Sequence, residues 1–328
     1  MDFPQVSVII VSARRRVELQ QCLASVMREL ASLRAEVIVV FNGDSSYHAQ
    51  VAQEFPGLQC IVCAPVTPGE ARNLAAARAA GEWIFFLDDD CELPPGYAQN
   101  IPLECSVDVL GGPDMLHPQA SSFQTSVSHA MASFAAGGRT RERHRSLRGG
   151  GVTATCELGL SACNLWVKSY VMRDRGFTFD PLFLRNEESE WLRRIEVAGF
   201  RICKNHDLVV WHHRRKRAAE IARNYFVSGA YRYLCLRRIF FWRDAVFLLP
   251  SLMIVLALPL YYFIPQSLGV FLLVYVAAVS ISVRFVAHRF DVLAIALHPL
   301  IHVSYGVGML AGVFQTHDRS RLVRRAQS

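Results

Sequence analysis

The chain has 328 residues, enough for one large domain or two ordinary domains. Hydrophobic residues make up 52% of it and the mean hydropathy is +0.22, which is high for a purely soluble protein. The formal net charge is +7, but basic and aromatic residues do not interleave in the polar part, which argues against a nucleic-acid partner. The nine cysteines include no second CxxC pair, so we expect reduced, structural thiols.

The N-terminal part alternates between strand and helix patterns. β-Branched strands are expected at residues 6–13 and 36–44, a third strand at 83–87, and helices at 17–30 and 67–81. Thr67 can cap the second helix and Gly81 can close it. This order predicts an α/β fold with a mostly parallel, Rossmann-like sheet. Ligands bind beyond the carboxyl ends of such strands, where the loops 12–16, 42–46 and 88–90 converge.

The middle of the chain is less regular. Residues 111–151 are rich in glycine and arginine, and this composition predicts a mobile loop and not a core element. The arginines of 139–148 could close over a substrate phosphate, or the segment could be a solvated linker. An acidic start and helical periodicity predict a helix at 185–200, and a last strand leads to His212.

Three apolar runs follow, at residues 245–264, 267–283 and 292–314. The first and third have about the 20 residues that a helix needs to cross a bilayer, and the second is slightly short. We therefore expect a basic juxtamembrane helix at 216–244, a transmembrane region at 245–316 and a basic tail at 317–328. The basic segments would face anionic membrane lipid.

The orientation of these runs follows from the flanking sequence. No secretory signal opens the chain, so the globular part is expected in the cytoplasm, at the inner or plasma membrane. Three crossings would put the basic tail on the far side, against the positive-inside tendency. Pro299 and the glycines of 306–312 could instead break the third run into a re-entrant hairpin. We slightly favour two crossings plus this hairpin over three crossings.

A buried strand runs directly into three carboxylates, Asp88, Asp89 and Asp90. Adjacent negative charges repel unless a cation or a set of donors holds them. Asp88 and Asp90 at a sheet edge suit Mg²⁺ or Mn²⁺, which keeps waters and bridges substrate phosphates. Such a cation would stabilise a diphosphate leaving group as a Lewis acid. A solvated acidic turn is the alternative.

Four segments together resemble inverting glycosyltransferases of family 2, which have the GT-A fold. They read VSVIIVSA, EVIVVFNGD, GEARNLAAARAAGEWIFFLDDD and NEESEWLRRIEVAGF, and they place a GT-A domain at residues 1–215. The sequence HVSYGVGMLAG and the loop from Gly111 to Gly138 are similar to membrane-bound members of the succinoglycan type. That subgroup implies exopolysaccharide or other lipid-linked glycan synthesis.

The resemblance assigns roles to individual positions. Asp88 and Asp90 match the DxD motif that holds the metal and the donor diphosphate. Glu187 and Glu188 match the pair whose second member is usually the general base, so Glu188 is expected as the base and Glu187 as the fallback. A base there would take the proton of the acceptor hydroxyl as it attacks the anomeric carbon. An acidic helix N-terminus favoured by the helix dipole is the alternative.

Other positions are expected to bind the donor. Arg72 matches a position that contacts the nucleotide or phosphate, although it could be a helix-surface charge. His212 matches a histidine that ligates metal or contacts phosphate, and neighbouring His213 leaves the choice open. The strand-end loops and the acidic motif complete the expected donor site: Ser12, Asn42, Asp44 and Asp89.

Two positions depart from the family pattern. Phe41 stands where an acidic residue commonly meets the nucleotide base, so Asn42 or Asp44 could take that role. Glu188 is one methylene longer than the usual aspartate. The QxxRW motif of processive synthases is absent, which favours transfer of a single sugar.

The sequence therefore predicts a membrane-anchored, metal-dependent, inverting glycosyltransferase. It would move one sugar from a nucleotide-sugar to a lipid-linked acceptor, such as a glycan on polyprenyl diphosphate. Two alternatives stay open: direct transfer to polyprenyl phosphate, and an inactive GT-A scaffold of a polysaccharide assembly complex.

Overall fold

The computed structural model describes residues 4–43, 46–101, 103–147 and 149–314. Asp44 and the basic tail at 317–328 lie outside these ranges. The chain folds into two compact units. Among the described residues, the first unit holds those up to Met115 together with Arg145–His212, and the second holds Leu116–His144 and residues 213–314. The domain limits expected from the sequence remain predictions.

The first unit is built on an eight-stranded sheet with the order β3-β2-β1-β4-β9-β6-β10-β8. Four neighbouring parallel strands are β1 (Val6–Ser12), β2 (Ala35–Asn42), β3 (Gln59–Cys63) and β4 (Trp83–Asp88). The remaining strands are β6 (Val109–Gly111), β8 (Val152–Ala154), β9 (Asn164–Lys168) and β10 (Ile202–Asn205). β10 runs parallel to β6, whereas β9 runs antiparallel to β4 and β6, and β8 runs antiparallel to β10. Six of the eight strands therefore share one direction, and the predicted mostly parallel α/β sheet is confirmed.

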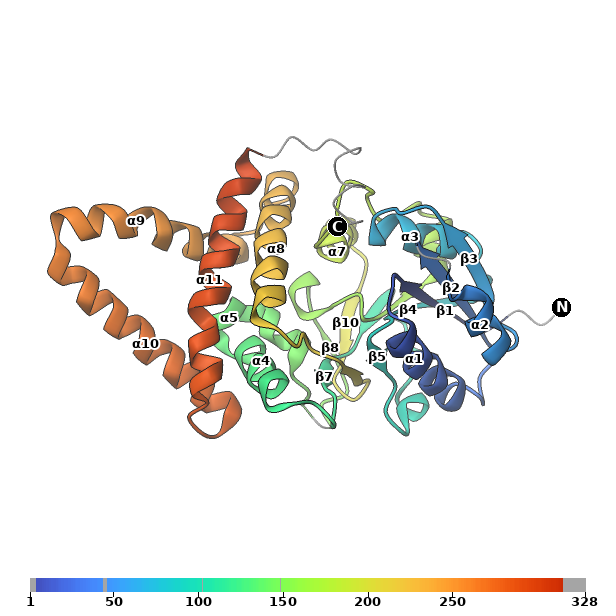
Figure 1. Ribbon diagram of the computed structural model, residues 1–328. Helices are drawn as coiled ribbons and strands as arrows, with labels where there is room; N and C mark the ends of the chain where they lie inside the picture. The colour runs from blue at the N-terminus through green and yellow to red at the C-terminus, as the bar shows by residue number, and fades with distance from the viewer. Residues whose placement is uncertain (1–3, 44–45, 102, 148, 315–328) are drawn as a thin grey trace. The chain divides into compact units, whose positions relative to one another are not determined.

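Helices cover both faces of this sheet (Figure 1). They are α1 (Arg16–Glu29), α2 (His48–Glu54), α3 (Pro68–Ala76), α6 (Ser169–Arg173) and α7 (Glu187–Val197). Alternate residues of a strand point to opposite faces. Val8 and Ile10 accordingly pack in one buried cluster with Leu19 of α1, while Ile9 packs in the other with Ala75 of α3. Because both faces are buried, the strands read as continuous apolar runs.

The structure corrects one boundary in this region. Thr67 caps α3 as expected, accepting a hydrogen bond from the Glu70 amide at 3.4 Å. The helix ends at Ala76, however, and does not extend to Gly81. Gly81 instead crosses β1 so closely that a Cβ atom there would lie 2.6 Å from the Ser7 nitrogen. Position 81 therefore needs a glycine, because the backbone of β1 lies too close to leave room for a side chain.

A second, three-stranded sheet carries the strand that holds His212. Its strands are β5 (Cys91–Glu92), β11 (Val210–His212) and β7 (Asp114–Leu116), in the order β5-β11-β7. β11 runs antiparallel to β5, with His212 opposite Cys91 and Trp211 opposite Glu92. This register brings His212 to the segment that directly follows the three aspartates.

The second unit is helical. It holds α4 (Ser122–Ala132), α5 (Phe134–Gly137), α8 (Ala218–Arg238), α9 (Leu249–Phe263), α10 (Pro265–Ala287) and α11 (Val292–Val313), with short 3₁₀ helices at Gly138–His144 and Trp242–Leu248. The expectation of a loop throughout 111–151 is therefore wrong. Ser121 and Gln124 form a reciprocal capping box, and Val127 and Ala130 are buried, so α4 has both a start signal and a packed face.

Helices α8 and α11 pack closely through glycines. A Cβ atom on Gly308 would lie 1.9 Å from the Phe226 carbonyl oxygen, and one on Gly229 would lie 2.1 Å from the Tyr305 carbonyl oxygen. Small residues allow such close contact between helix backbones in membrane proteins. These two positions therefore set the distance between α8 and α11.

We expect Gly308→Ala to destabilise the protein, because the added methyl group must push α8 and α11 apart. Overpacking of this kind costs about 1–3 kcal/mol. Gly269→Ala in α10 is the matched control, since nothing lies within 4 Å of a Cβ atom there. That control should be neutral or stabilise by up to about 1 kcal/mol. Thermal unfolding of both variants in detergent tests this, and equal midpoints would contradict the close packing.

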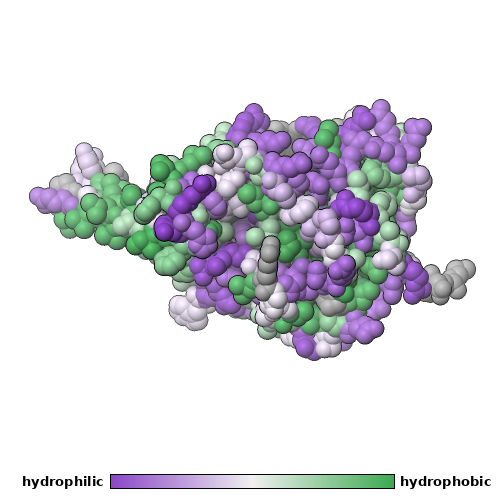
Figure 2. Space-filling model, turned by 90° about the horizontal axis from the view of Figure 1, so that it is seen from below, coloured by the Kyte–Doolittle hydropathy of each residue, from purple (hydrophilic) through white to green (hydrophobic). Residues whose placement is uncertain are grey.

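Three helical segments are long and apolar enough to cross a membrane: Trp242–Phe263, Gln266–Ala287 and Val292–Val313. Large apolar side chains on α9 and α10 are exposed, including Val255, Phe263 and Leu273. Hydrophobic side chains cover much of the region formed by these two helices (Figure 2). Exposed apolar surface on this scale suits contact with lipid.

The favoured re-entrant hairpin is wrong, because α11 is one continuous helix through Pro299. Pro299 cannot donate a backbone hydrogen bond, yet side chains support the helix around it. The His298 ring donates to the Ala294 carbonyl at 2.7 Å and accepts from Ser133 of the segment between α4 and α5 at 2.8 Å. Asp291 caps the start of α11 and accepts a hydrogen bond from Ser126 of α4.

Candidate active site

The three aspartates that follow β4 have different surroundings. The Asp88 side chain is 36% exposed, whereas those of Asp89 and Asp90 are only 6% and 7% exposed. Asp89 accepts hydrogen bonds from Ser12 at 2.7 Å and from Arg15 at 3.0 Å. Asp90 binds the same Arg15 guanidinium. The run is therefore no solvated acidic turn, because two of its three carboxylates are buried and held by donors.

Arg15 was not expected in the site. It follows Arg14, whose left-handed φ of 63° turns the chain after β1 and lets the next side chain reach across to Asp89 and Asp90. The guanidinium partly neutralises these adjacent negative charges. Burial, together with the charge of Asp90, still raises the pKa of Asp89 to about 7, and Arg15 and the Ser12 hydroxyl oppose this shift.

His212 contacts Asp90. Its Nε2 atom lies 3.3 Å from the Asp90 Oδ1 atom, and its Nδ1 atom lies 3.2 Å from the Asp114 Oδ2 atom. Asp114 is a further residue that the sequence did not point to. A carboxylate on the far nitrogen fixes the orientation of an imidazole that serves as a metal ligand. His213 instead stacks on His117 in the second unit, which leaves His212 as the histidine of this site.

The structure brings together two of the three predicted metal ligands, Asp90 and His212. Asp90 offers a carboxylate beside the His212 imidazole, and Asp88 offers a second, more exposed carboxylate two residues away. Carboxylate oxygens suit Mg²⁺ and Mn²⁺, and an imidazole ligand is acceptable to the transition metals. Asp88, Asp90 and His212 would hold such an ion, which would supply Lewis-acid stabilisation of a leaving diphosphate.

Arg72 links the acidic motif to the predicted base pair. Its buried guanidinium donates to the Asp88 Oδ1 atom at 2.9 Å and to the Glu187 Oε1 atom at 2.5 Å. The interpretation of Arg72 as a helix-surface charge is therefore wrong, since the side chain is only 7% exposed. With two carboxylates on its guanidinium, Arg72 positions Asp88 and Glu187 relative to each other.

We expect Arg72→Met to destabilise the first unit, because it leaves Glu187 buried without its cation. Removing one partner of a buried ion pair costs about 3–5 kcal/mol. The ion pair between Arg72 and the more exposed Asp88 should contribute little to this loss of stability. Arg78→Met is the control, because Arg78 is an exposed arginine just beyond the same helix. Denaturant unfolding measures both variants, and an unchanged midpoint for Arg72→Met would contradict the buried linkage.

Glu187 and Glu188 begin α7, directly after Asn186, which has a left-handed φ of 57°. Both are buried. Burial and the charge of Glu188 raise the pKa of Glu187, whereas Arg72 opposes the shift. Farther along the helix, Glu190 pairs with Arg194 at 2.9 Å.

Helix α7 is fixed in the core of the first unit. Arg193 pairs with Glu157 at 2.8 Å, with both side chains at most 1% exposed, and the Trp191 indole donates to the Phe177 carbonyl at 2.7 Å. A rigid helix is what a base needs, because its distance from the acceptor hydroxyl must be held closely.

The residues expected to bind the nucleotide are engaged within the protein. Asn42 uses its amide to hold Val66, donating to its carbonyl at 3.0 Å and accepting from its amide at 2.9 Å. Ser12 is fully buried and supports Asp89. Phe41 is also fully buried and packs edge-on against Tyr47 at 5.4 Å, so it does not offer a face to a base. Asp44 lies outside the described residues.

Comparisons with known proteins bear on the fold and on the N-terminal part of the chain. The sequence profile described as "Glycosyl transferase family 2" matches residues 7–101. No curated protein has a sequence that matches this chain significantly. The mannosyltransferase PcManGT of Pyrobaculum calidifontis, solved with GDP-Man and Mn²⁺, is similar in fold with a TM-score of 0.55 and 14% identity, over 96% of this chain and 87% of that one. S. aureus TarS 1–349, solved with UDP-GlcNAc, has a TM-score of 0.50 and 14% identity, over 94% of this chain and 91% of that one.

Proposed function

We propose that this chain, whose residues 7–101 match the profile of glycosyltransferase family 2, transfers one sugar from a nucleotide-sugar to a lipid-linked acceptor, with inversion at the anomeric carbon. One observation carries this proposal. At the carboxyl edge of the sheet, Asp90 meets His212 while Arg72 joins Asp88 to Glu187, so one contact runs from the acidic motif to the predicted metal-binding histidine and another runs from it to the predicted base pair.

The donor diphosphate is the part of the substrate that the acidic motif would hold. Asp88, Asp90 and His212 would bind Mg²⁺ or Mn²⁺, and the ion would stabilise the nucleoside diphosphate as it leaves. Asp89 serves a different purpose. Asp89 is buried against Ser12 and Arg15, and these contacts hold the turn that carries Asp88 and Asp90.

Glu188 is the proposed general base, with Glu187 as the fallback. Arg72 already binds Glu187, which assigns that carboxylate to positioning. Glu188 would take the proton from the acceptor hydroxyl, and the hydroxyl oxygen would attack the anomeric carbon from the face opposite the diphosphate.

The apolar helices make a lipid-linked acceptor the natural choice. The segments Trp242–Phe263, Gln266–Ala287 and Val292–Val313 would anchor the chain, and an acceptor on polyprenyl diphosphate would already reside in the same membrane. The arginines of the 3₁₀ helix Gly138–His144 are suited to the acceptor's phosphates. We place the catalytic unit in the cytoplasm, where nucleotide-sugars are made. Exopolysaccharide synthesis of the succinoglycan type is the assembly process we propose.

A donor-by-acceptor assay tests this function. The full chain in detergent is incubated with a panel of nucleotide-sugars, Mn²⁺ or Mg²⁺, and either polyprenyl phosphate or a glycan on polyprenyl diphosphate, and the lipid products are analysed by mass spectrometry. We expect one sugar added to the diphosphate-linked glycan. Product formed only on polyprenyl phosphate would favour the alternative enzyme, and addition of many sugars would contradict single transfer.

A further inference from the structure

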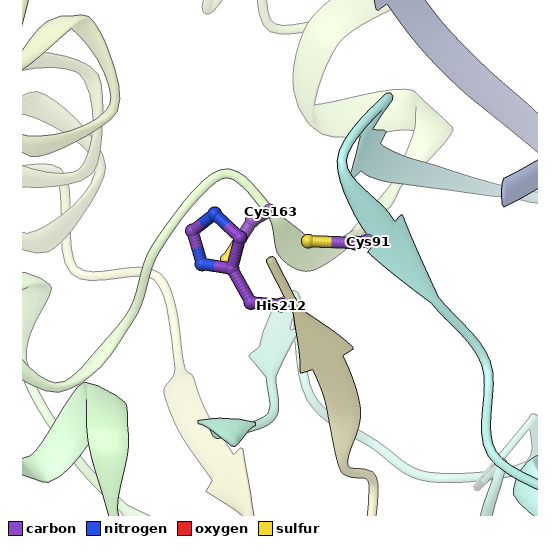
Figure 3. Close-up of side chains that lie close together, drawn as sticks. All are labelled: Cys91, Cys163 and His212. Atoms are coloured by element: carbon purple, nitrogen blue, oxygen red, sulfur yellow. The ribbon is translucent and has the colours of Figure 1, made fainter. Parts of the chain in front are cut away.

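Two buried thiols lie beside His212 (Figure 3). Cys91 is on β5 directly opposite His212, and Cys163 immediately precedes β9. The thiols are at most 1% exposed, and the ligand atoms of Cys91, Cys163 and His212 all lie within 4.8 Å of one another. The Cys91 side chain points from its strand toward the other two (Figure 3). Neither thiol has a part in the sugar transfer described above.

Asp114 borders this cluster next to Cys163 and His212, although it is not among the residues whose ligand atoms all lie within 4.8 Å of one another. Its Oδ2 atom lies 3.4 Å from the Cys163 Sγ atom and 3.2 Å from the His212 Nδ1 atom. Four ligands around a tetrahedral zinc ion, with bonds of 2.0–2.3 Å, lie roughly 3.3–3.8 Å from one another. The two separations of Asp114 are close to that spacing, and the ligand atoms of the other three residues lie within 4.8 Å of one another.

We propose that Cys91, Cys163 and His212, bordered by Asp114, form a second metal site, selective for Zn²⁺, and that zinc bound there inhibits the enzyme. Zinc accepts two thiolates and an imidazole as ligands, whereas Mg²⁺ prefers oxygen ligands. Binding displaces the two thiol protons to solvent, so the metal and the protons balance.

Inhibition follows from the shared histidine, and this part rests on the proposed function. When His212 serves the thiol site, it no longer serves the ion held by Asp88 and Asp90. A second divalent cation beside Asp90 would also repel the catalytic one, because like charges this close interact strongly in a buried site. Zinc is therefore expected to compete with Mn²⁺ or Mg²⁺, although His212 is the only ligand that the two sites share.

Cobalt reports on the site directly. Reduced, metal-free full-length chain in detergent is titrated with Co²⁺ in the presence of excess Mg²⁺, and absorption from sulfur-to-cobalt charge transfer is recorded. We expect one cobalt per chain with a thiolate signal that zinc abolishes. The variants Cys91→Ser and Cys163→Ser, and the corresponding alanine variants, should lose the signal. Cys60→Ser, on β3, should keep it.

A second measurement needs no variant. Mass spectrometry maps alkylation of each cysteine in the wild-type chain, and zinc should slow labelling of Cys91 and Cys163 but not of Cys60. The absence of a thiolate signal, a signal unchanged in the Cys91 and Cys163 variants, or zinc protection of all three cysteines alike would overturn the proposal.

Sugar-transfer assays with added zinc distinguish failure of the zinc-site proposal from failure of the proposed function. Zinc at fixed Mn²⁺ should lower sugar transfer by roughly tenfold or more, and the Cys91 and Cys163 variants should be less sensitive. A thiolate–cobalt signal without any transferase activity would keep the zinc site and count against the proposed function. Transfer that zinc leaves unchanged would reject the inhibitory role.

Discussion

The variant Asp90→Asn is expected to lose metal-dependent sugar transfer by roughly 10²- to 10³-fold, which corresponds to the several kcal/mol that a bound cation supplies to a developing charge. Asp90 is the carboxylate that meets His212, and its neutral amide would bind a divalent ion poorly. Arg15 and Asp89 would keep their own contact at 3.0 Å, so the loop should stay folded. The measurement is kcat/KM for the donor over a series of Mn²⁺ concentrations.

Glu82→Gln provides the control for Asp90→Asn. Glu82 lies just before β4, at the opposite end of the strand, and its side chain is 68% exposed where it pairs with Lys168. This substitution also removes one negative charge, yet it should leave transfer unchanged. If Asp90→Asn keeps the wild-type dependence on Mn²⁺, then Asp90 does not hold the metal.

The second large effect concerns Glu188. We expect Glu188→Gln to lower kcat by roughly 10²- to 10⁴-fold, the contribution of a positioned general base, with the KM for the donor changed little. A glutamine keeps the size of the side chain but cannot accept the proton of the acceptor hydroxyl. Single-turnover transfer to a diphosphate-linked glycan is the appropriate measurement, because it isolates the chemical step.

Two companion variants sharpen the test of Glu188. Glu187→Gln should reduce activity through loss of its ion pair with Arg72, and part of its effect should therefore appear as reduced stability. Glu196→Gln, near the end of the same helix, should have little effect. If Glu187→Gln abolishes the chemical step while Glu188→Gln does not, the base is Glu187.

The acceptor decides how Glu188→Gln should be interpreted. A polyprenyl phosphate acceptor is already an anion, so it attacks without losing a proton to a base. Activity that largely survives Glu188→Gln would therefore favour direct transfer to polyprenyl phosphate. Loss of activity with the glycan acceptor supports the reaction proposed here.

Much of the fold could be predicted from local sequence patterns. β1, β2 and β4 are continuous apolar runs because both faces of the sheet are buried. The start of α3 is predicted by Thr67 as its N-cap and by Pro68 in its first turn. The family profile covers this same part of the chain, at residues 7–101. The errors came where local signals conflict with packing. Helix α4 was missed because glycine and arginine dominate its surroundings, and Pro299 suggested a break in a helix that tertiary contacts keep continuous.

The sequence predicted the three aspartates and the two glutamates of the candidate site, but not which side chains they contact. The contacts of Arg15 with Asp89, Arg72 with Glu187, and His212 with Asp114 join residues 74, 115 and 98 positions apart. No local pattern encodes pairings of that kind. The sequence also could not reveal that the side chains of Ser12 and Asn42 form hydrogen bonds to other residues of the protein, because their burial depends on the whole sheet.

Equilibrium binding of nucleotide-sugars tests the central claim most directly. The full chain in detergent, as wild type and as Asp90→Ala, is titrated with a panel of donors in Mn²⁺, Mg²⁺ or EDTA. We expect that one donor binds, that EDTA abolishes binding, and that Asp90→Ala binds it far more weakly under every condition. Equal donor binding with and without metal, or no binding of any donor by the wild type, would contradict a metal-dependent nucleotide-sugar site at Asp88 and Asp90.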